Sequence, residues 1–172
     1  MAETDPTKSD FKEDLIQIIE SREDIQGRFT KIRRIDKDAG NGNFSLVFKA
    51  IDDKSKRHRE VVLKFMNPLI EEYRKECFSR EAKILEDLQG QRNILPLIQK
   101  MSALNIPLND SVTGRTFPIV IPFYVSYLAE YNISQYIYEK GPNYKTNIII
   151  FREICKAVQR IHRHKVSDQL LS

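Results

Sequence analysis

The sequence predicts an α+β fold in which five strands, with one helix after the third, precede a helical end. Apolar residues alternate with other residues in the segment 44–52, "FSLVFKAID", as in a half-buried strand. Apolar residues recur every three or four positions in 73–90 and in 147–165, as in helices that bury one face. The chain has 172 residues, 41% of them hydrophobic, which is enough for one domain with an appended arm.

The first elements are a helix and three strands. Residues 1–8 are expected to lack regular structure, and a helix is expected over 11–24 after a cap at Ser9 or Asp10. Its apolar stripe consists of Leu15, Ile18, Ile19 and Ile25. Strands are then expected at 28–35, 44–52 and 60–66.

Two features of this region need an interpretation. The strand 60–66 is apolar on both faces except at Lys64, which predicts a strand covered on both sides. The basic run 54–60 contains no aromatic residue, so we expect a solvated loop there and no nucleic-acid interface.

The second half of the chain begins with a helix over 73–90 that ends at Gly90. Its apolar stripe consists of Cys77, Phe78, Ala82, Leu85 and Leu88. Strands follow at 93–104 and 116–124, and helices at 130–140 and 147–165. One face of the last helix carries Phe151, Ile154, Cys155, Val158 and Ile161.

Composition and charge exclude several classes of protein. The longest apolar run, 148–151, is far shorter than the roughly 20 residues of a membrane span, so no membrane association is expected. The acidic, polar N-terminus has no apolar signal segment. We interpret Cys77 and Cys155 as free core thiols of a protein in a reducing, cytoplasmic compartment. No His or Cys cluster has the spacing of a metal site.

The turn between the second and third expected elements holds Gly40 and Gly42, two of only six glycines in the chain. Glycine accepts positive φ and lets the backbone approach a ligand closely, which a turn folded over phosphates requires. An ordinary Asn-Gly hairpin turn is the alternative interpretation.

Lys64 and Glu81 are charged residues at positions whose neighbours on the same face are apolar. Lys64 lies in an apolar strand, and Glu81 lies between Phe78 and Leu85 on the inward face of the next helix. Because a buried unpaired charge is costly, we expect the two side chains to form an ion pair. Such a pair either fixes packing alone or serves a function.

These residues together resemble the N-terminal lobe of a eukaryotic-type Ser/Thr protein kinase, and the resemblance covers about 28–166. It divides the chain into an arm (1–27), a kinase N-lobe with a five-stranded antiparallel sheet and one αC-type helix (28–124), and a partial helical C-lobe (125–172). It implies a glycine-rich loop over the phosphates of ATP, a lysine that binds them and a glutamate that orients the lysine.

The resemblance also assigns a gatekeeper at Ile121 and a hinge from Pro122 to Tyr124. The nucleotide-binding residues that it implies are Gly40, Asn41, Gly42, Asn43, Phe44, Ser45, Val47, Val62, Lys64, Glu81, Ile121, Phe123 and Tyr124.

Three positions depart from the family pattern. Ser45 replaces the third glycine and Val62 replaces an alanine, which stiffens the lid and narrows the adenine slot. Leu170 stands where the family has its catalytic aspartate, and Asp168 occupies the slot of the preceding histidine. This ending is typical of a truncated or frame-shifted chain. No catalytic residue or magnesium ligand is therefore expected, although the family uses magnesium, and ATP binding is expected to be weak.

Two functions follow from the resemblance. The first is a kinase-like, ATP-binding protein that is catalytically incomplete. The second is a non-catalytic kinase-like remnant that binds a protein partner or a second copy of itself. The last helix, whose apolar face the missing segments would cover in the family, is the expected contact surface.

Overall fold

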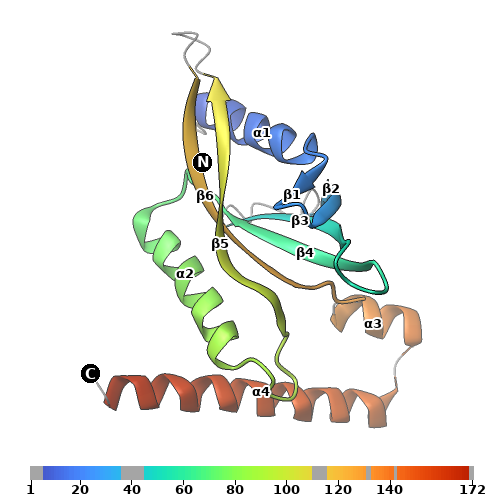
Figure 1. Ribbon diagram of the computed structural model, residues 1–172. Helices are drawn as coiled ribbons and strands as arrows, with labels where there is room; N and C mark the ends of the chain where they lie inside the picture. The colour runs from blue at the N-terminus through green and yellow to red at the C-terminus, as the bar shows by residue number, and fades with distance from the viewer. Residues whose placement is uncertain (1–5, 36–44, 110–115, 131–132, 142, 171–172) are drawn as a thin grey trace. The chain divides into compact units, whose positions relative to one another are not determined.

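The computed structural model describes residues 6–35, 45–109, 116–130, 133–141 and 143–170. The chain divides into two compact units (Figure 1). The first comprises Met1–Lys83 and Leu97–Leu128, and the second comprises Ile84–Pro96 and Ala129–Ser172.

The first unit is built on an antiparallel sheet with the strand order β1-β2-β3-β4-β6-β5. Its six strands are β1 (Asp24–Ile25), β2 (Phe29–Arg34), β3 (Ser45–Asp52), β4 (Arg59–Met66), β5 (Leu97–Asn109) and β6 (Thr116–Tyr127). The connection from β4 to β5 contains helix α2 (Glu72–Asp87). In the sheet, β6 lies between β4 and β5.

The predicted fold class, a kinase N-lobe with a five-stranded sheet, is wrong. A sixth strand forms because the chain turns at Gln26 and Gly27, both at positive φ, and pairs β1 with β2 where the sequence predicted the end of a helix. The sheet also curls until its two edges meet. The Gln26 side chain donates to Ser102 Oγ at 2.7 Å and accepts from Gln99 Nε2 at 2.7 Å, which joins the β1 turn to β5 in a nearly closed, barrel-like arrangement.

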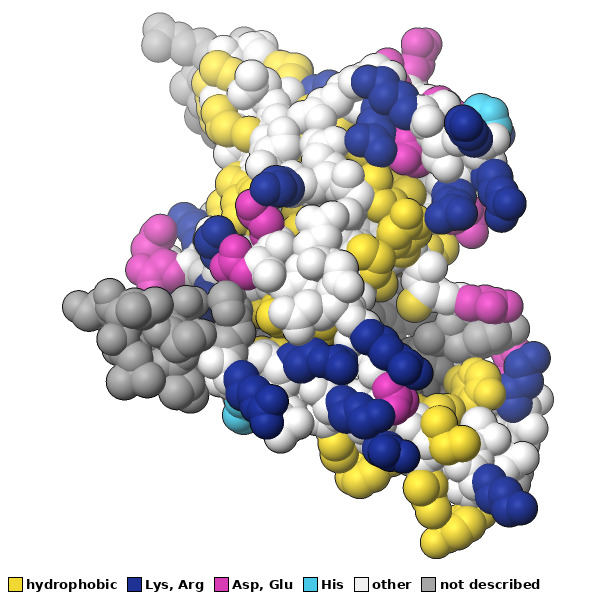
Figure 2. All heavy atoms as spheres, turned by 60° about the horizontal axis from the view of Figure 1, so that its bottom comes forward, with side chains coloured by type: hydrophobic (Ala, Val, Ile, Leu, Met, Phe, Trp, Pro, Cys, Tyr) yellow, Lys and Arg dark blue, Asp and Glu magenta, His cyan; other side chains and the backbone are white. Residues whose placement is uncertain are grey.

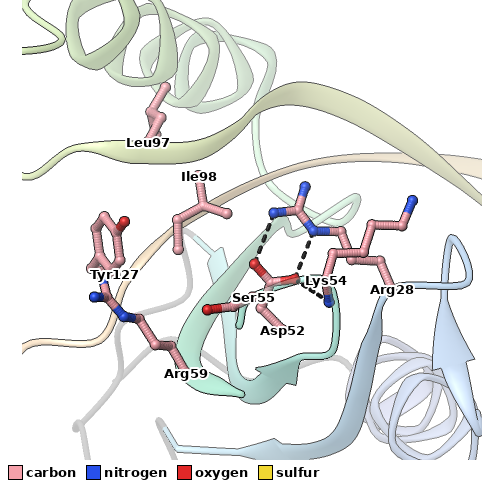
Figure 3. Close-up of a pocket in the computed structure, with 8 residues that line it drawn as sticks. All are labelled: Arg28, Asp52, Lys54, Ser55, Arg59, Leu97, Ile98 and Tyr127. Atoms are coloured by element: carbon pink, nitrogen blue, oxygen red, sulfur yellow. Dashed lines mark hydrogen bonds and ion pairs between the residues drawn. The ribbon is translucent and has the colours of Figure 1, made fainter. Parts of the chain in front are cut away.

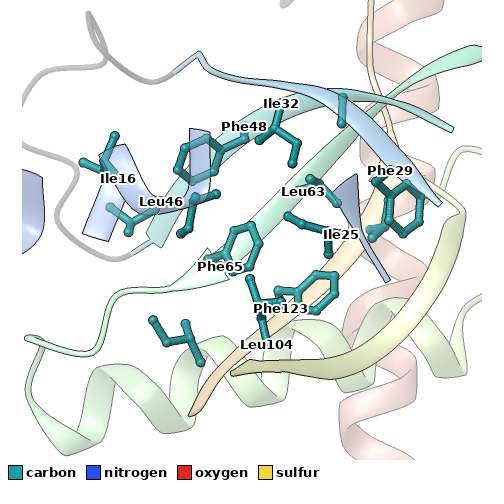
Figure 4. Close-up of a cluster of buried hydrophobic side chains, with 14 of the residues drawn as sticks. Ile16, Ile25, Phe29, Ile32, Leu46, Phe48, Leu63, Phe65, Leu104 and Phe123 are labelled. Atoms are coloured by element: carbon teal, nitrogen blue, oxygen red, sulfur yellow. The ribbon is translucent and has the colours of Figure 1, made fainter. Parts of the chain in front are cut away.

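The hydrophobic core lies inside this curled sheet (Figure 4). The Phe65 ring stacks on Phe123 with centroids 4.9 Å apart and meets Phe48 edge-on at 5.6 Å. Helix α1 (Pro6–Glu20) closes the core with Leu15 and Ile19, which are completely buried. Such aromatic and aliphatic burial is the main source of stability in a unit of this size.

The opposite face of the sheet is only partly covered. In β4 the residues Val61, Leu63 and Phe65 are completely buried in the core, whereas Val62 and Lys64 are half-buried. The prediction that this strand is covered on both sides is therefore wrong. Helix α2 lies over part of that second face, where the Phe78 ring packs 5.4 Å from the Tyr124 ring.

The second unit holds helices α3 (Ile133–Lys140) and α4 (Tyr144–Leu170). Glu153 of α4 accepts hydrogen bonds from Asn93 Nδ2 at 2.5 Å and from Lys156 Nζ at 2.6 Å. The Arg160 guanidinium donates to the carbonyl oxygen of Arg92. These bonds attach the 91–96 turn to α4. Cys155 of α4 is exposed, so its predicted place in the core is wrong.

Two kinds of feature are absent from the described residues, a membrane-spanning helix and a cluster of metal ligands. None of the described helices combines the length and the hydropathy that crossing a membrane requires. Nor do three or more His, Cys, Asp or Glu side chains gather as a metal site in the part of the chain that the structure describes.

Candidate functional site

Lys64 and Glu81 form the ion pair that the sequence predicts. Strand β4 supplies Lys64 and helix α2 supplies Glu81. The Lys64 Nζ donates to the two carboxylate oxygens of Glu81 at 2.7 and 2.8 Å. The second face of the sheet and the helix that lies on it thus meet through two charge-assisted hydrogen bonds.

Tyr124 is the third member of this group. Strand β6 pairs with β4 so that Tyr124 lies opposite Lys64, and its hydroxyl donates to Glu81 Oε1 at 3.0 Å. Lys64 Nζ lies 5.7 Å from the centre of the Tyr124 ring. Burial raises the pKa of the Tyr124 hydroxyl, and the Glu81 carboxylate raises it further, so the phenol remains a neutral donor.

The ion pair is less buried than the sequence predicts. The Lys64 side chain is 25% exposed and the Glu81 side chain is 47% exposed. The prediction that both lie on buried faces is wrong because α2 covers this face of the sheet incompletely and leaves its Glu81 edge open. The pair is therefore reachable by a solute.

A cavity of about 280 Å³ opens beside the pair. Its lining residues come from the start of β3, from β4 and from one face of α2: Ser45, Lys64, Arg74, Cys77, Phe78 and Glu81. Two cations and one carboxylate give the lining a net positive charge, and Phe78 supplies an apolar wall. This arrangement suits an anionic group attached to an apolar one.

The structure brings together only some of the predicted site residues. Ser45, Val47, Val62 and Lys64 lie on the second face of the sheet, the face that also carries Tyr124. By strand alternation, Ile121 and Phe123 lie on the other face, where both are completely buried in the core and have no surface for a ligand. The glycine-loop positions Gly40, Asn41, Gly42, Asn43 and Phe44 lie outside the described residues.

Sequence reasoning did not identify three residues that line the cavity. Arg74, Cys77 and Phe78 precede Glu81 by seven, four and three positions on α2. Residues at these spacings share one helix face, so the pair with Lys64 would have identified them. The bond from Tyr124 was missed because Tyr124 was interpreted as a hinge residue.

The lining residues do not suit a magnesium ion. Magnesium prefers oxygen ligands, and a nucleotide-bound ion usually contacts one or two carboxylates. Among the described lining residues, Glu81 is the one carboxylate, and Lys64 and Tyr124 already occupy its oxygens.

Comparison with known proteins supports a relationship to protein kinases. No protein-family model matches the chain. The sequence is 34% identical over 116 residues to a probable serine/threonine-protein kinase of Dictyostelium discoideum. The match covers 65% of this chain and 17% of that protein, so the chain corresponds to a small part of its relative. The chain is thus similar in sequence to part of a probable kinase.

Proposed function

We propose that the chain is a kinase-like, nucleotide-binding protein in which Lys64 binds the phosphates of ATP and Glu81 orients Lys64. The observation that carries the proposal is the pair itself, a lysine held by a carboxylate at 2.7 Å on the wall of an open cavity. The similarity to a probable serine/threonine kinase supports the same assignment. Phosphoryl transfer to protein Ser or Thr is the reaction that this relationship suggests for the whole protein.

The chemistry of the cavity supports phosphate binding. The Lys64 ammonium has three N–H donors, and Glu81 uses two of them. Arg74 supplies a second cation on the same wall, and its guanidinium matches phosphate oxygens geometrically. Phe78 contributes an apolar surface beside these charges.

We expect the binding to be weak and independent of magnesium. A bound metal would neutralise the phosphate charge in a kinase, and the described lining residues offer it no unoccupied carboxylate. We also expect no phosphoryl transfer by this chain, because the resemblance places Leu170 at the position of the catalytic aspartate and a leucine accepts no proton.

Thermal unfolding with 10 mM ATP tests the proposal. A dissociation constant of about 1 mM would stabilise the protein by about 1.4 kcal/mol, which raises Tm by about 3–6 °C. Tripolyphosphate and adenosine, tested separately, show which part of the nucleotide is bound. Lys64→Met should remove most of the shift.

Lys49→Met is the matched control. Lys49 lies on the same face of the neighbouring strand and pairs with Glu60 at 3.4 Å, but it does not line the cavity. The control should keep the full shift. An equal loss in both variants, or tight binding that requires magnesium, would contradict the proposal.

Exposed apolar side chains on α4 favour a second candidate function, association with another copy of this chain. Apolar side chains gather together with Lys and Arg side chains on the lower part of Figure 2, where α4 lies. Tyr144, Ile148, Phe151 and Val158 are 81%, 48%, 68% and 46% exposed. With exposed Cys155 they follow each other at spacings of four, three, four and three residues.

This spacing is the heptad seam of a two-stranded coiled coil. A second copy offers an identical seam, and in a parallel pair Arg152 would face Asn147 of the other copy, so no like charges meet. The same register places Cys155 opposite its own counterpart. Fully burying one such apolar side chain contributes about 1.5–3 kcal/mol.

Light scattering tests this candidate. Val158→Asp should convert a dimer to a monomer, whereas Ile149→Asp, an exposed apolar position outside the seam, should leave the dimer intact. Mild oxidation should cross-link two chains through Cys155. A wild-type monomer at all concentrations would contradict association.

A further inference from the structure

A second cavity, of about 340 Å³, lies at another part of the same sheet (Figure 3). It is formed by the turn between β3 and β4, the residue before β2, and the parts of β5 and β6 beside them. Arg59, which lines it, precedes Lys64 by five residues in β4, a separation of about 17 Å along a strand. The two cavities share no lining residue.

One wall of this cavity is fixed by an ion pair. Arg28 Nε and Nη2 each donate to an oxygen of Asp52 at 2.8 Å, and the backbone N–H of Lys54 also donates to Asp52 at 3.1 Å. Asp52 is almost fully buried, and its bonds to Arg28 hold the pKa of its carboxyl below the ordinary value. The Arg28 guanidinium is therefore held in one position, with three N–H donors that Asp52 does not use.

Two further cations line the cavity from its turn and from β4. The Lys54 and Arg59 side chains have no carboxylate partner among the described residues. The Arg59 guanidinium instead lies 5.7 Å from the centre of the Tyr127 ring. By contrast, Lys49, Lys64 and Lys156 each contact a glutamate.

The charges of the lining define the chemistry of a ligand. Three cations and one carboxylate give the cavity a net charge of +2. A phosphate monoester carries a charge of about −1.5 to −2 at neutral pH, and an Arg guanidinium can donate two parallel hydrogen bonds to two of its oxygens. Ser55 supplies a hydroxyl to the same cavity. A single carboxylate ligand would leave about half of this positive charge unneutralised.

The remaining lining residues favour an organic phosphate over the free ion. Ile98 and the Tyr127 ring give the cavity an apolar side, whereas the Leu97 side chain points away from the other lining residues (Figure 3). A phosphate attached to an aryl or alkyl group would place its anion between Arg28 and Arg59 and its apolar part against this side. We propose that this cavity binds a phosphate monoester of an apolar group. The proposal does not depend on nucleotide binding beside Lys64.

Calorimetric titration with phenyl phosphate tests the proposal, carried out in Lys64→Met protein so that the first cavity does not contribute. The variant pair Lys54→Gln with Arg59→Gln should weaken binding at least tenfold. The control pair Lys56→Gln with Arg57→Gln removes the same charge from the same turn without touching the lining, and should change affinity less than twofold. Circular dichroism establishes that each variant is folded.

Three outcomes would overturn the proposal: no heat of binding at 10 mM phenyl phosphate, equal losses in the two variant pairs, or inorganic phosphate binding as tightly as phenyl phosphate. Equal losses would show general surface electrostatics. If phenyl phosphate binds as expected, a phosphotyrosine peptide distinguishes the source of the ligand. Tighter binding of the peptide assigns a phosphorylated protein segment, and equal or weaker binding assigns a free phosphate ester.

Discussion

Removing the Lys64–Glu81 pair should affect nucleotide binding far more than it affects folding. The perturbation is a double-mutant cycle of Lys64→Met, Glu81→Gln and the combined variant. The cycle isolates the coupling between the two side chains from their other contacts. The decisive structural fact is that the side chains are 25% and 47% exposed.

The expected magnitudes follow from this exposure. Ion pairs open to solvent contribute about 0.2–1 kcal/mol to the free energy of unfolding, because water solvates each charge nearly as well as the partner does. The coupling energy in unfolding should therefore stay below about 1 kcal/mol, and each single variant should lower Tm by no more than about 4 °C. A charge-assisted hydrogen bond to phosphate is stronger, about 1.5–3 kcal/mol, so Lys64→Met should weaken ATP binding roughly 10- to 100-fold.

Two assays measure the two quantities. Urea unfolding of the four proteins gives the coupling energy, and calorimetric titration with ATP gives the affinities. Glu81→Gln should weaken binding less than Lys64→Met does, since Lys64 keeps its charge and loses only its orientation.

Two results would refute this reasoning. A coupling energy of about 3 kcal/mol would show that the pair is desolvated and structural, because a loss of that size is typical when a buried ion pair loses one partner. An ATP affinity that is the same in wild type and Lys64→Met would show that Lys64 does not bind the phosphates.

Three further predictions concern stability. Ile121→Ala should cost about 2–5 kcal/mol in urea unfolding, because Ile121 is completely buried, and should leave ATP affinity unchanged; a lost affinity with normal stability would contradict the core assignment. Tyr124→Phe should cost about 1 kcal/mol in urea unfolding, since it removes the bond to Glu81 but keeps the ring. The absorbance difference between wild type and Tyr124→Phe in alkali should contain no phenolate signal until the protein unfolds, and a phenolate signal from the folded protein would contradict the burial of Tyr124. The hydrogen bonds from Lys156 and Asn93 lower the pKa of Glu153 to about 2, so the stability that Glu153 contributes is present above about pH 4.5 and is lost toward pH 2. In Glu153→Gln, stability should therefore fall less between pH 4.5 and pH 2 than in wild type, and identical acid-unfolding curves would refute this.

The sequence predicts most of the strands and the ion pair because their signals are local. The alternation in β3 places Leu46 and Phe48 in the core, as it does in the structure. The isolation of Lys64 and Glu81 in apolar segments is likewise visible in single elements. Their pairing followed from chemistry alone, because each of two opposite charges in neighbouring elements needs a partner.

The features that the sequence did not predict depend on contacts between distant residues. Strand β1 has only two residues, and its place in the sheet depends on a turn at Gln26 whose side chain reaches Ser102 and Gln99. No local pattern marks such a strand. The closure of the sheet that follows from it changed the fold class.

The phase of β6 explains why only part of the predicted site assembles. The segment 116–127 is apolar almost throughout, so alternation does not show which of its residues face the core. The pairing of β6 with β4 decides this, because Lys64 lies opposite Tyr124 and Phe65 lies opposite Phe123. Residues opposite each other in a sheet share a face. Tyr124 therefore joins Lys64 and Glu81, and Phe123 joins the core around Phe65. A site assigned along one strand is therefore determined by the register of that strand with its pairing partner, which here sets Tyr124 opposite Lys64.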